Sequence, residues 1–168
     1  PIVTGGRIYI TGEVKDELHV FALDSEGKLL WTAKNGRSWR GPYPGARACC
    51  AFSEGRVYHM NGNGRVACLD AATGREIWAV EALERFDGKA PTWGIGECLL
   101  VTGEKVRGKV IGKVIVTPGG RKAAMAALDK LTGETVWASE PVALDGPSGA
   151  GDAPQGPPRL DFDTASYA

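Results

Sequence analysis

The fold is decided by the stretch Ala127-Leu-Asp-Lys-Leu-Thr-Gly-Glu-Thr-Val-Trp137, because two further versions of it occur upstream. Residues 68–78 read Cys-Leu-Asp-Ala-Ala-Thr-Gly-Arg-Glu-Ile-Trp, and residues 22–31 read Ala-Leu-Asp-Ser-Glu-Gly-Lys-Leu-Leu-Trp, one residue shorter and without the Thr. In each version an Asp and a Gly between apolar residues predict a tight hairpin turn. The Trp residues that end the versions lie 47 and 59 residues apart, and such a spacing indicates a repeat architecture.

Each version follows another β-rich run, at residues 7–11, 56–60 and 113–117. Apolar and polar residues alternate in these runs, as they do in half-buried strands. Two more strand candidates, Ala46–Phe52 and Gly94–Val101, precede the second and third runs. Four strands per repeat predict an all-β fold, namely a β-propeller of four-stranded antiparallel blades.

The chain of 168 residues has room for about three such blades, so the sequence predicts a partial propeller. Propellers close with about 4–8 blades, and we therefore expect the remaining blades to come from the same longer chain or from another subunit. The predicted divisions are a partial blade 1 at residues 1–36, blade 2 at 37–81, blade 3 at 82–140, a Pro- and Gly-rich loop or linker at 141–163, and the start of a further blade at 164–168.

Two local features are predicted inside these divisions. The tandem Gly-Lys-Val-Ile sequence at residues 108–115 predicts a lengthened loop or a hairpin in blade 3. The charged segment Glu81–Phe86 is compatible with a single helical turn.

The repeated pattern Ala-x-Asp-x-x-Thr-Gly-x-x-x-Trp resembles the tryptophan-docking motif of the PQQ-type, or quinoprotein-like, β-propellers. Residues 127–137 match it at every position, and residues 68–78 match at all but the first. In that family the Trp lies between adjacent blades and stacks on a neighbouring Gly-containing turn. The resemblance covers roughly residues 5–140 and implies a structural role for the motif residues Asp24, Gly27, Trp31, Asp70, Thr73, Gly74, Trp78, Asp129, Thr132, Gly133 and Trp137.

The segment from Lys34 to Arg47 carries four basic side chains, two aromatic ones and no acidic one. In a propeller this connection crosses one face of the ring. It predicts either a rim that binds an anion or polymer, or a solvated loop whose aromatic side chains cover the blade edge. In related propellers the region of Trp93 and Glu97 approaches the central channel, where Arg47 would join them as a channel-mouth cluster. The predicted binding rim consists of Arg37, Trp39, Arg40, Tyr43, Arg47, Trp93 and Glu97.

Adjacent Cys49 and Cys50 raise the question of a vicinal disulfide, which quinoprotein alcohol dehydrogenases place against their PQQ cofactor. Neighbouring side chains of a strand point to opposite faces, so two small structural residues are the favoured interpretation. Cys68 and Cys98 lie on other predicted strands and lack metal-ligand spacing. His59 is interpreted as a packed strand residue. The sequence therefore predicts no metal site and no catalytic residue.

Composition and charge argue against several classes of function. Twenty basic and twenty acidic residues cancel, so the charge gives no sign of a nucleic-acid partner. No apolar run is long enough for a transmembrane segment. Two His residues without a Ser-His-Asp arrangement do not support a hydrolase or lyase.

Two functions remain. The preferred one is a non-catalytic scaffold that binds a protein or polysaccharide partner and needs no cofactor, similar to the lipoproteins of outer-membrane barrel assembly. The alternative is part of a PQQ-dependent alcohol dehydrogenase, which would hold PQQ with calcium and would need grouped oxygen ligands. No such group is recognisable, since Glu97 stands alone. The resemblance implies a periplasmic or secreted location, although the chain contains no signal peptide.

Overall fold

The computed structural model describes residues 1–107 and 109–140. Within them, strands pair into three four-stranded antiparallel sheets, one for each repeat. The first sheet has the order β1-β2-β3-β4 and contains β1 (Ile2–Thr4), β2 (Arg7–Val14), β3 (Glu17–Asp24) and β4 (Leu29–Arg37). The second has the order β5-β6-β7-β8 and contains β5 (Ala51–Ser53), β6 (Arg56–Met60), β7 (Arg65–Asp70) and β8 (Glu76–Glu81).

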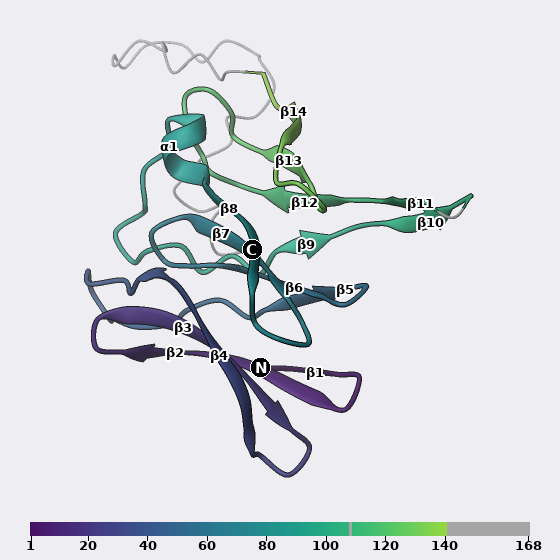
Figure 1. Ribbon diagram of the computed structural model, residues 1–168. Helices are drawn as coiled ribbons and strands as arrows, with labels where there is room; N and C mark the ends of the chain where they lie inside the picture. The colour runs from purple at the N-terminus through teal and green to yellow at the C-terminus, as the bar shows by residue number, and fades with distance from the viewer. Residues whose placement is uncertain (108, 141–168) are drawn as a thin grey trace, which may run out of the picture.

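The third sheet repeats this order with one addition. It contains β9 (Leu100–Val101), β12 (Lys113–Val116), β13 (Ala126–Asp129) and β14 (Thr135–Ala138). Between β9 and β12 the chain forms a separate two-stranded hairpin from β10 (Glu104–Val106) and β11 (Lys109–Ile111), which projects away from the sheets in Figure 1. The tandem repeat of the sequence thus contributes to a hairpin.

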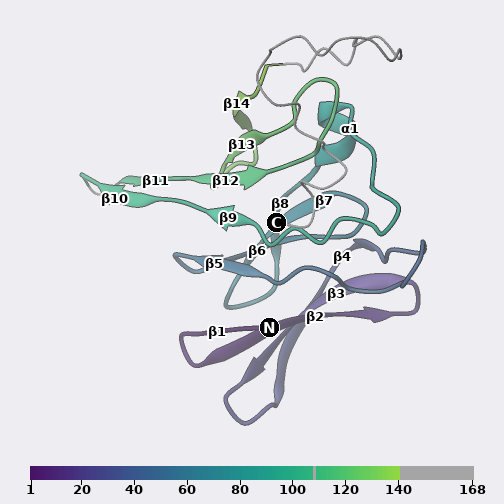
Figure 2. The same ribbon diagram turned by 180° about the vertical axis from the view of Figure 1, so that it is seen from behind.

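The three sheets follow one another in space in chain order, with the second between the first and the third in both views (Figures 1 and 2). This arrangement explains why β6 is buried on both faces. Val57 packs with Tyr9 and Trp31 of the first sheet, whereas its neighbour Tyr58 packs with Val114 of the third. The described chain is therefore an all-β partial propeller with three blades, as the sequence predicts, and each core lies between two blades.

The entry strands of blades 2 and 3 are shorter than predicted. The predicted strands Ala46–Phe52 and Gly94–Val101 are reduced to β5 and β9. The preceding residues use their backbone groups elsewhere: the Ala48 carbonyl accepts a hydrogen bond from Thr11 Oγ1 at 3.1 Å, and the Ile95 amide donates to the Gly62 carbonyl at 3.0 Å. These contacts tie the connections to neighbouring blades and leave less backbone for the ladders.

The helical turn predicted after blade 2 is present as α1 (Ala82–Phe86), the α-helix of the described residues. No helix in residues 1–107 and 109–140 has the length and apolar character needed to cross a membrane. The predicted linker at 141–163 and the further blade start at 164–168 lie outside the described residues. The exact blade boundaries stay predictions.

Candidate functional site

The repeated turns are built by the motif aspartates. Asp70 Oδ1 accepts hydrogen bonds from the Ala72 and Thr73 amides and from Thr73 Oγ1, at 2.8–3.0 Å. These bonds lower the pKa of the Asp70 carboxyl, and the bond from the Thr73 side chain has the largest effect. Asp129 accepts from two amides of its own turn in the same way, and so does Asp24 in the shorter first version. The three aspartates are therefore occupied by local structure.

Two of the motif Trp residues contact the turn of the following blade. Trp31 Nε1 donates to the Ala71 carbonyl at 3.1 Å, and Trp78 Nε1 donates to the Lys130 carbonyl at 3.2 Å. A Cβ atom added to Gly74 would lie 2.6 Å from the Trp31 ring. Trp31 and Trp78 are buried, whereas Trp137 is 40% exposed. How much these contacts stabilise the fold stays a prediction.

A pocket of about 520 Å³ lies on the face where β4 ends and where β6 turns into β7. Its lining comes from blade 1, from the blade 2 turn and from the connection between them: Gly36, Arg37, Ser38, Trp39, Arg40, Gly41, Asn61, Asn63, Arg65 and Glu81. A second hollow of about 520 Å³ shares Arg37, Ser38 and Arg40 with it. The predicted rim residues Arg37, Trp39 and Arg40 therefore meet in one place.

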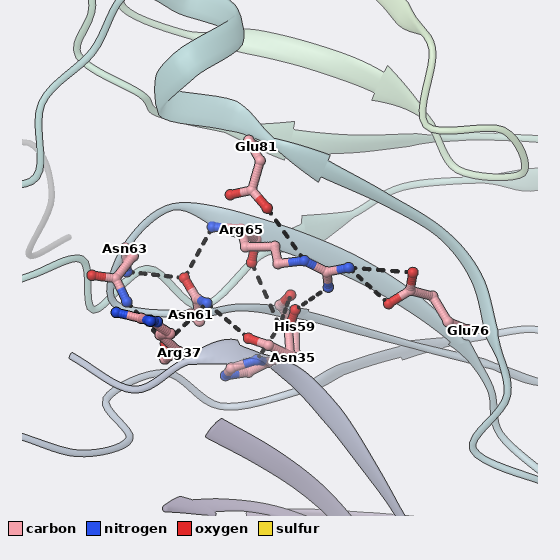
Figure 3. Close-up of polar contacts among 8 residues, drawn as sticks. All are labelled: Asn35, Arg37, His59, Asn61, Asn63, Arg65, Glu76 and Glu81. Atoms are coloured by element: carbon pink, nitrogen blue, oxygen red, sulfur yellow. Dashed lines mark hydrogen bonds and ion pairs between the residues drawn. The ribbon is translucent and has the colours of Figure 1, made fainter. Parts of the chain in front are cut away.

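Asparagine side chains, among them Asn61 of the pocket lining, join the two blades (Figure 3). Asn61 Nδ2 donates to the Asn35 carbonyl at 2.7 Å, and Asn61 Oδ1 accepts from the Arg65 amide at 2.9 Å. Asn35 Nδ2 lies 2.9 Å from His59 Nδ1, so the neutral ring carries its proton on Nε2. His59 is fully buried, and this burial lowers its pKa to about 4 because it disfavours the charged ring.

Arg65 is held in place from three sides in Figure 3. Its Nη1 donates to Asn35 Oδ1 at 2.7 Å, while Nη2 and Nε pair with Glu76 at 3.0 Å and with Glu81 at 3.3 Å. Two carboxylates thus neutralise this guanidinium. Arg65 serves as a bracket between β4, β7 and β8.

Intramolecular pairs also offset much of the basic segment between blades 1 and 2. Lys34 Nζ pairs with Glu17 at 2.6 Å, and Arg40 pairs with Glu13 and Asp16. Arg37 is exposed, and no ion pair joins it to another residue of the described chain. Of the four basic groups of the sequence, Lys34 and Arg40 are thus paired with acids, while Arg37 and Arg47 have no ion pair among the described residues, and Arg37 is the exposed one of these two.

The aromatic side chains of the predicted rim divide into a packed ring and an exposed pair. Trp39 is half-buried, and a Cβ added to Gly62 or Gly94 would lie 2.8 or 2.6 Å from its side chain. Tyr43 and Trp93 contact one another with tilted rings, 5.4 Å apart between centroids, and are 75% and 43% exposed. The connections after blades 1 and 2 thus meet and offer an aromatic surface beside the pocket.

The channel-mouth cluster is not joined by direct polar contacts in the described structure. Arg47 donates to the backbone carbonyls of Pro42 and Tyr43, and Glu97 accepts from the Thr117 amide at 3.1 Å. Burial raises the pKa of the Glu97 carboxyl, and the Thr117 amide partly offsets this effect. The grouping of Arg47, Trp93 and Glu97 at a channel stays a prediction.

The acidic side chains that could contribute to a calcium site have other partners among the described residues. The motif aspartates accept hydrogen bonds in their own turns, and Glu97 is 8% exposed and bound to a backbone amide. No group of three His, Cys, Asp or Glu side chains gathers for a metal ion within residues 1–107 and 109–140. Cys49 and Cys50 are free thiols in this structure.

Sequence reasoning missed Ser38 of the connection and the pocket residues that blade 2 supplies, namely Asn61, Asn63, Arg65 and Glu81. A signal was present in the Asn61-Gly-Asn-Gly64 turn, because a β6–β7 turn lies at the same edge as the end of β4. The sequence thus allowed the prediction that these Asn side chains lie next to Arg37.

Comparison with known proteins agrees with the fold. The chain is 29% identical over 150 residues to methanol dehydrogenase [cytochrome c] subunit 1 of Methylorubrum extorquens, covering 82% of this chain and 22% of that protein. It is 31% identical over 149 residues to quinohemoprotein alcohol dehydrogenase ADH-IIG of Pseudomonas putida, covering 82% and 18%. The chain thus spans about a fifth of the length of these curated relatives.

Among solved structures, a europium-containing methanol dehydrogenase superposes with a TM-score of 0.56 at 23% identity, over 80% of this chain and 23% of that one. This likeness supports the fold. A family model described as outer membrane protein assembly factor BamB matches residues 1–151. Because this match covers most of the chain, the chain belongs to the family of PQQ-like repeat β-propellers.

Proposed function

We propose that these blades act as a non-catalytic scaffold that binds a protein partner. One observation carries the proposal: the exposed Tyr43–Trp93 pair adjoins Gly94, which lies against Trp39 of the pocket that presents the exposed Arg37. Tyr, Trp and Arg are the residues that most often dominate the binding energy of protein interfaces. The description of the matching family as an assembly factor supports the same class of function.

The exposed guanidinium of Arg37, which has no ion pair among the described residues, favours an acidic partner surface. A carboxylate placed in the pocket would pair with Arg37 without displacing an existing ion pair, because Arg40 and Arg65 already have their partners. The aromatic pair supplies rigid apolar area at low cost in conformational entropy. We place this function in the periplasm or outside the cell, and the description of the family as an outer membrane protein assembly factor supports a place in the cell envelope.

The test is affinity capture by the full-length protein from an envelope extract of its own organism, with quantification of the retained proteins. Trp93→Ala should weaken retention of a specific protein roughly tenfold or more, as for other interface hot spots. Met125→Ala is the matched control, since Met125 and Trp93 are each 43% exposed. Identical retention by both variants contradicts the proposal, and loss of an acidic polysaccharide instead would change the partner class.

The runner-up is a part of a PQQ-dependent alcohol dehydrogenase. The observation in its favour is that the curated relatives named above carry dehydrogenase names and match 82% of this chain. In that case the residues that hold PQQ and calcium would lie outside those described. The two candidates differ in one property, namely whether the protein oxidises an alcohol.

A further inference from the structure

Two cysteines 49 residues apart in the sequence meet where the chain enters blades 2 and 3. The Cys49 amide donates a hydrogen bond to Cys98 Sγ at 3.3 Å. Cys49 precedes β5 by two residues, and Cys98 precedes β9 by two residues, so they occupy equivalent positions in adjacent blades. The strands β5 and β9 also contact one another.

We propose that Cys49 and Cys98 form a reversible disulfide that clips blade 2 to blade 3. A sulfur 3.3 Å from the partner's amide nitrogen keeps the two Cα atoms within roughly 7.5 Å at full extension. Disulfides usually join Cα atoms about 4.4–6.8 Å apart. The upper limit exceeds this range by less than about 1 Å, so rotation of the Cys49 side chain about its Cα–Cβ bond, with a backbone adjustment of at most about that size, brings the sulfurs together.

Solvent exposure favours a disulfide between Cys49 and Cys98 over one between the adjacent Cys49 and Cys50. Cys49 and Cys98 are both exposed, so a small oxidant reaches them from solvent. Cys50 is buried in the core between blades 1 and 2, next to Tyr9 and Trp31. Its burial, with a smaller contribution from Cys49, raises the pKa of its thiol to about 12, which suppresses the reactive thiolate.

The oxidant is a small disulfide such as oxidised glutathione. One thiolate of the pair attacks the glutathione disulfide, forms a mixed disulfide and releases one glutathione thiolate, which takes up a proton. The second thiolate then attacks the protein sulfur of the mixed disulfide and releases the other glutathione. The protein loses two electrons and two protons, and one oxidised glutathione becomes two reduced ones.

The clip closes a long loop across two blades. Cross-links of this kind stabilise a fold mainly by restricting the unfolded chain, and the effect grows with loop length. For a chain of this size we expect oxidation to raise Tm by roughly 5–10 °C. Oxidation would then fix blade 3 against blade 2 independently of the Trp78 contact.

The experiment oxidises the purified protein with oxidised glutathione, blocks free thiols with iodoacetamide, and maps the peptides by mass spectrometry. The peptide that carries Cys49 should be linked to the one that carries Cys98, and Tm should rise. Cys49→Ser and Cys98→Ser should each abolish the link and the rise in Tm, whereas Cys50→Ala should keep both.

Three outcomes would overturn the proposal. They are a Cys49–Cys50 link in the wild-type protein, a stable glutathione adduct without a link to Cys98, and no oxidation at all. Fragmentation of the linked peptide distinguishes Cys49 from Cys50 in the wild-type protein itself. The result therefore does not depend on whether a cysteine variant folds.

Discussion

Gly74 and Gly133 occupy the same position in successive repeats, and each lies against the Trp of the preceding blade. Both have positive φ values, 75° and 74°, as the tight turn requires. Each glycine thus meets two demands at once, because the turn needs its backbone freedom and the Trp ring fills the space of a side chain. We expect this contact between the Trp ring and the turn to fix how two blades meet.

The contact of Trp78 predicts a large loss of stability on truncation. Trp78→Ala removes a ring that is 8% exposed and leaves a cavity between blades, so the free energy of unfolding should fall by about 3–5 kcal/mol. Guanidinium denaturation measures it. Ile77→Ala is the control from the same strand, and its loss should stay well below that of Trp78→Ala because the Ile77 side chain is 37% exposed. A loss below about 1 kcal/mol for Trp78→Ala would contradict a docking role.

The glycines allow a separate test of the same contact. An alanine at Gly133 would place its Cβ 2.7 Å from the Trp78 ring, whereas an alanine at Gly27 meets nothing within 4 Å. Both positions have positive φ, so both variants carry the backbone strain of a non-glycine residue. The free energy of unfolding should therefore be about 1–3 kcal/mol lower for Gly133→Ala than for Gly27→Ala. Equal losses in thermal or chemical melts would mean that the ring does not sit on this turn.

At the scale of single elements, the motif turns were predictable because every interaction that shapes them is local. Asp70 and Thr73 act on amides two or three residues away, so the sequence contains the whole cause. The entry strands were predicted too long, because Ala48 and Ile95 bond to residues more than thirty positions away. Hydrogen bonds between residues of different blades cannot be predicted from the pattern of neighbouring residues in the sequence.

In the candidate site too, the features set by neighbouring residues were predictable, and those set by distant residues were not. The sequence pointed to Arg37, Trp39 and Arg40, since a basic aromatic segment without acids is recognisable by composition. It did not point to Arg65, because the role of this residue depends on Asn35, 30 positions earlier. Nor did it show that Arg40 and Lys34 are paired, since their partners lie on β2, β3 and the turn between them.

The buried His59 predicts a pH dependence of the junction between blades 1 and 2. Its pKa lies at about 4 in the folded state against 6.5 ordinarily, so the unfolded chain binds the proton first as pH falls. The free energy of unfolding should therefore drop by about 2 kcal/mol between pH 7 and pH 5 from this group alone. Denaturation at both values measures the drop.

His59→Gln removes this contribution while keeping a side chain that hydrogen-bonds. The variant should lose less stability between pH 7 and pH 5 than the wild type. The comparison also cancels Glu97, whose raised pKa acts in the opposite sense in both proteins. If the two proteins show the same pH dependence, the Asn35–His59 contact does not hold a neutral ring.

At the scale of the whole molecule, blade 2 is the organising unit. It shares one core with blade 1 and another with blade 3, and its β6–β7 turn supplies the floor of the pocket. The pocket and the Tyr43–Trp93 pair both lie where connections from neighbouring blades converge. A binding surface made of connections can vary while the blades keep their packing.

Whether the protein oxidises alcohols is the question that decides between the two functions. The direct measurement incubates the full-length protein with PQQ and Ca²⁺, then records the quinone absorbance and dye reduction with ethanol as substrate, beside a known quinoprotein dehydrogenase as positive control. The scaffold account predicts an unchanged quinone spectrum and no alcohol-dependent dye reduction. Alcohol-dependent dye reduction above the rate without protein would contradict it and assign these blades to a dehydrogenase.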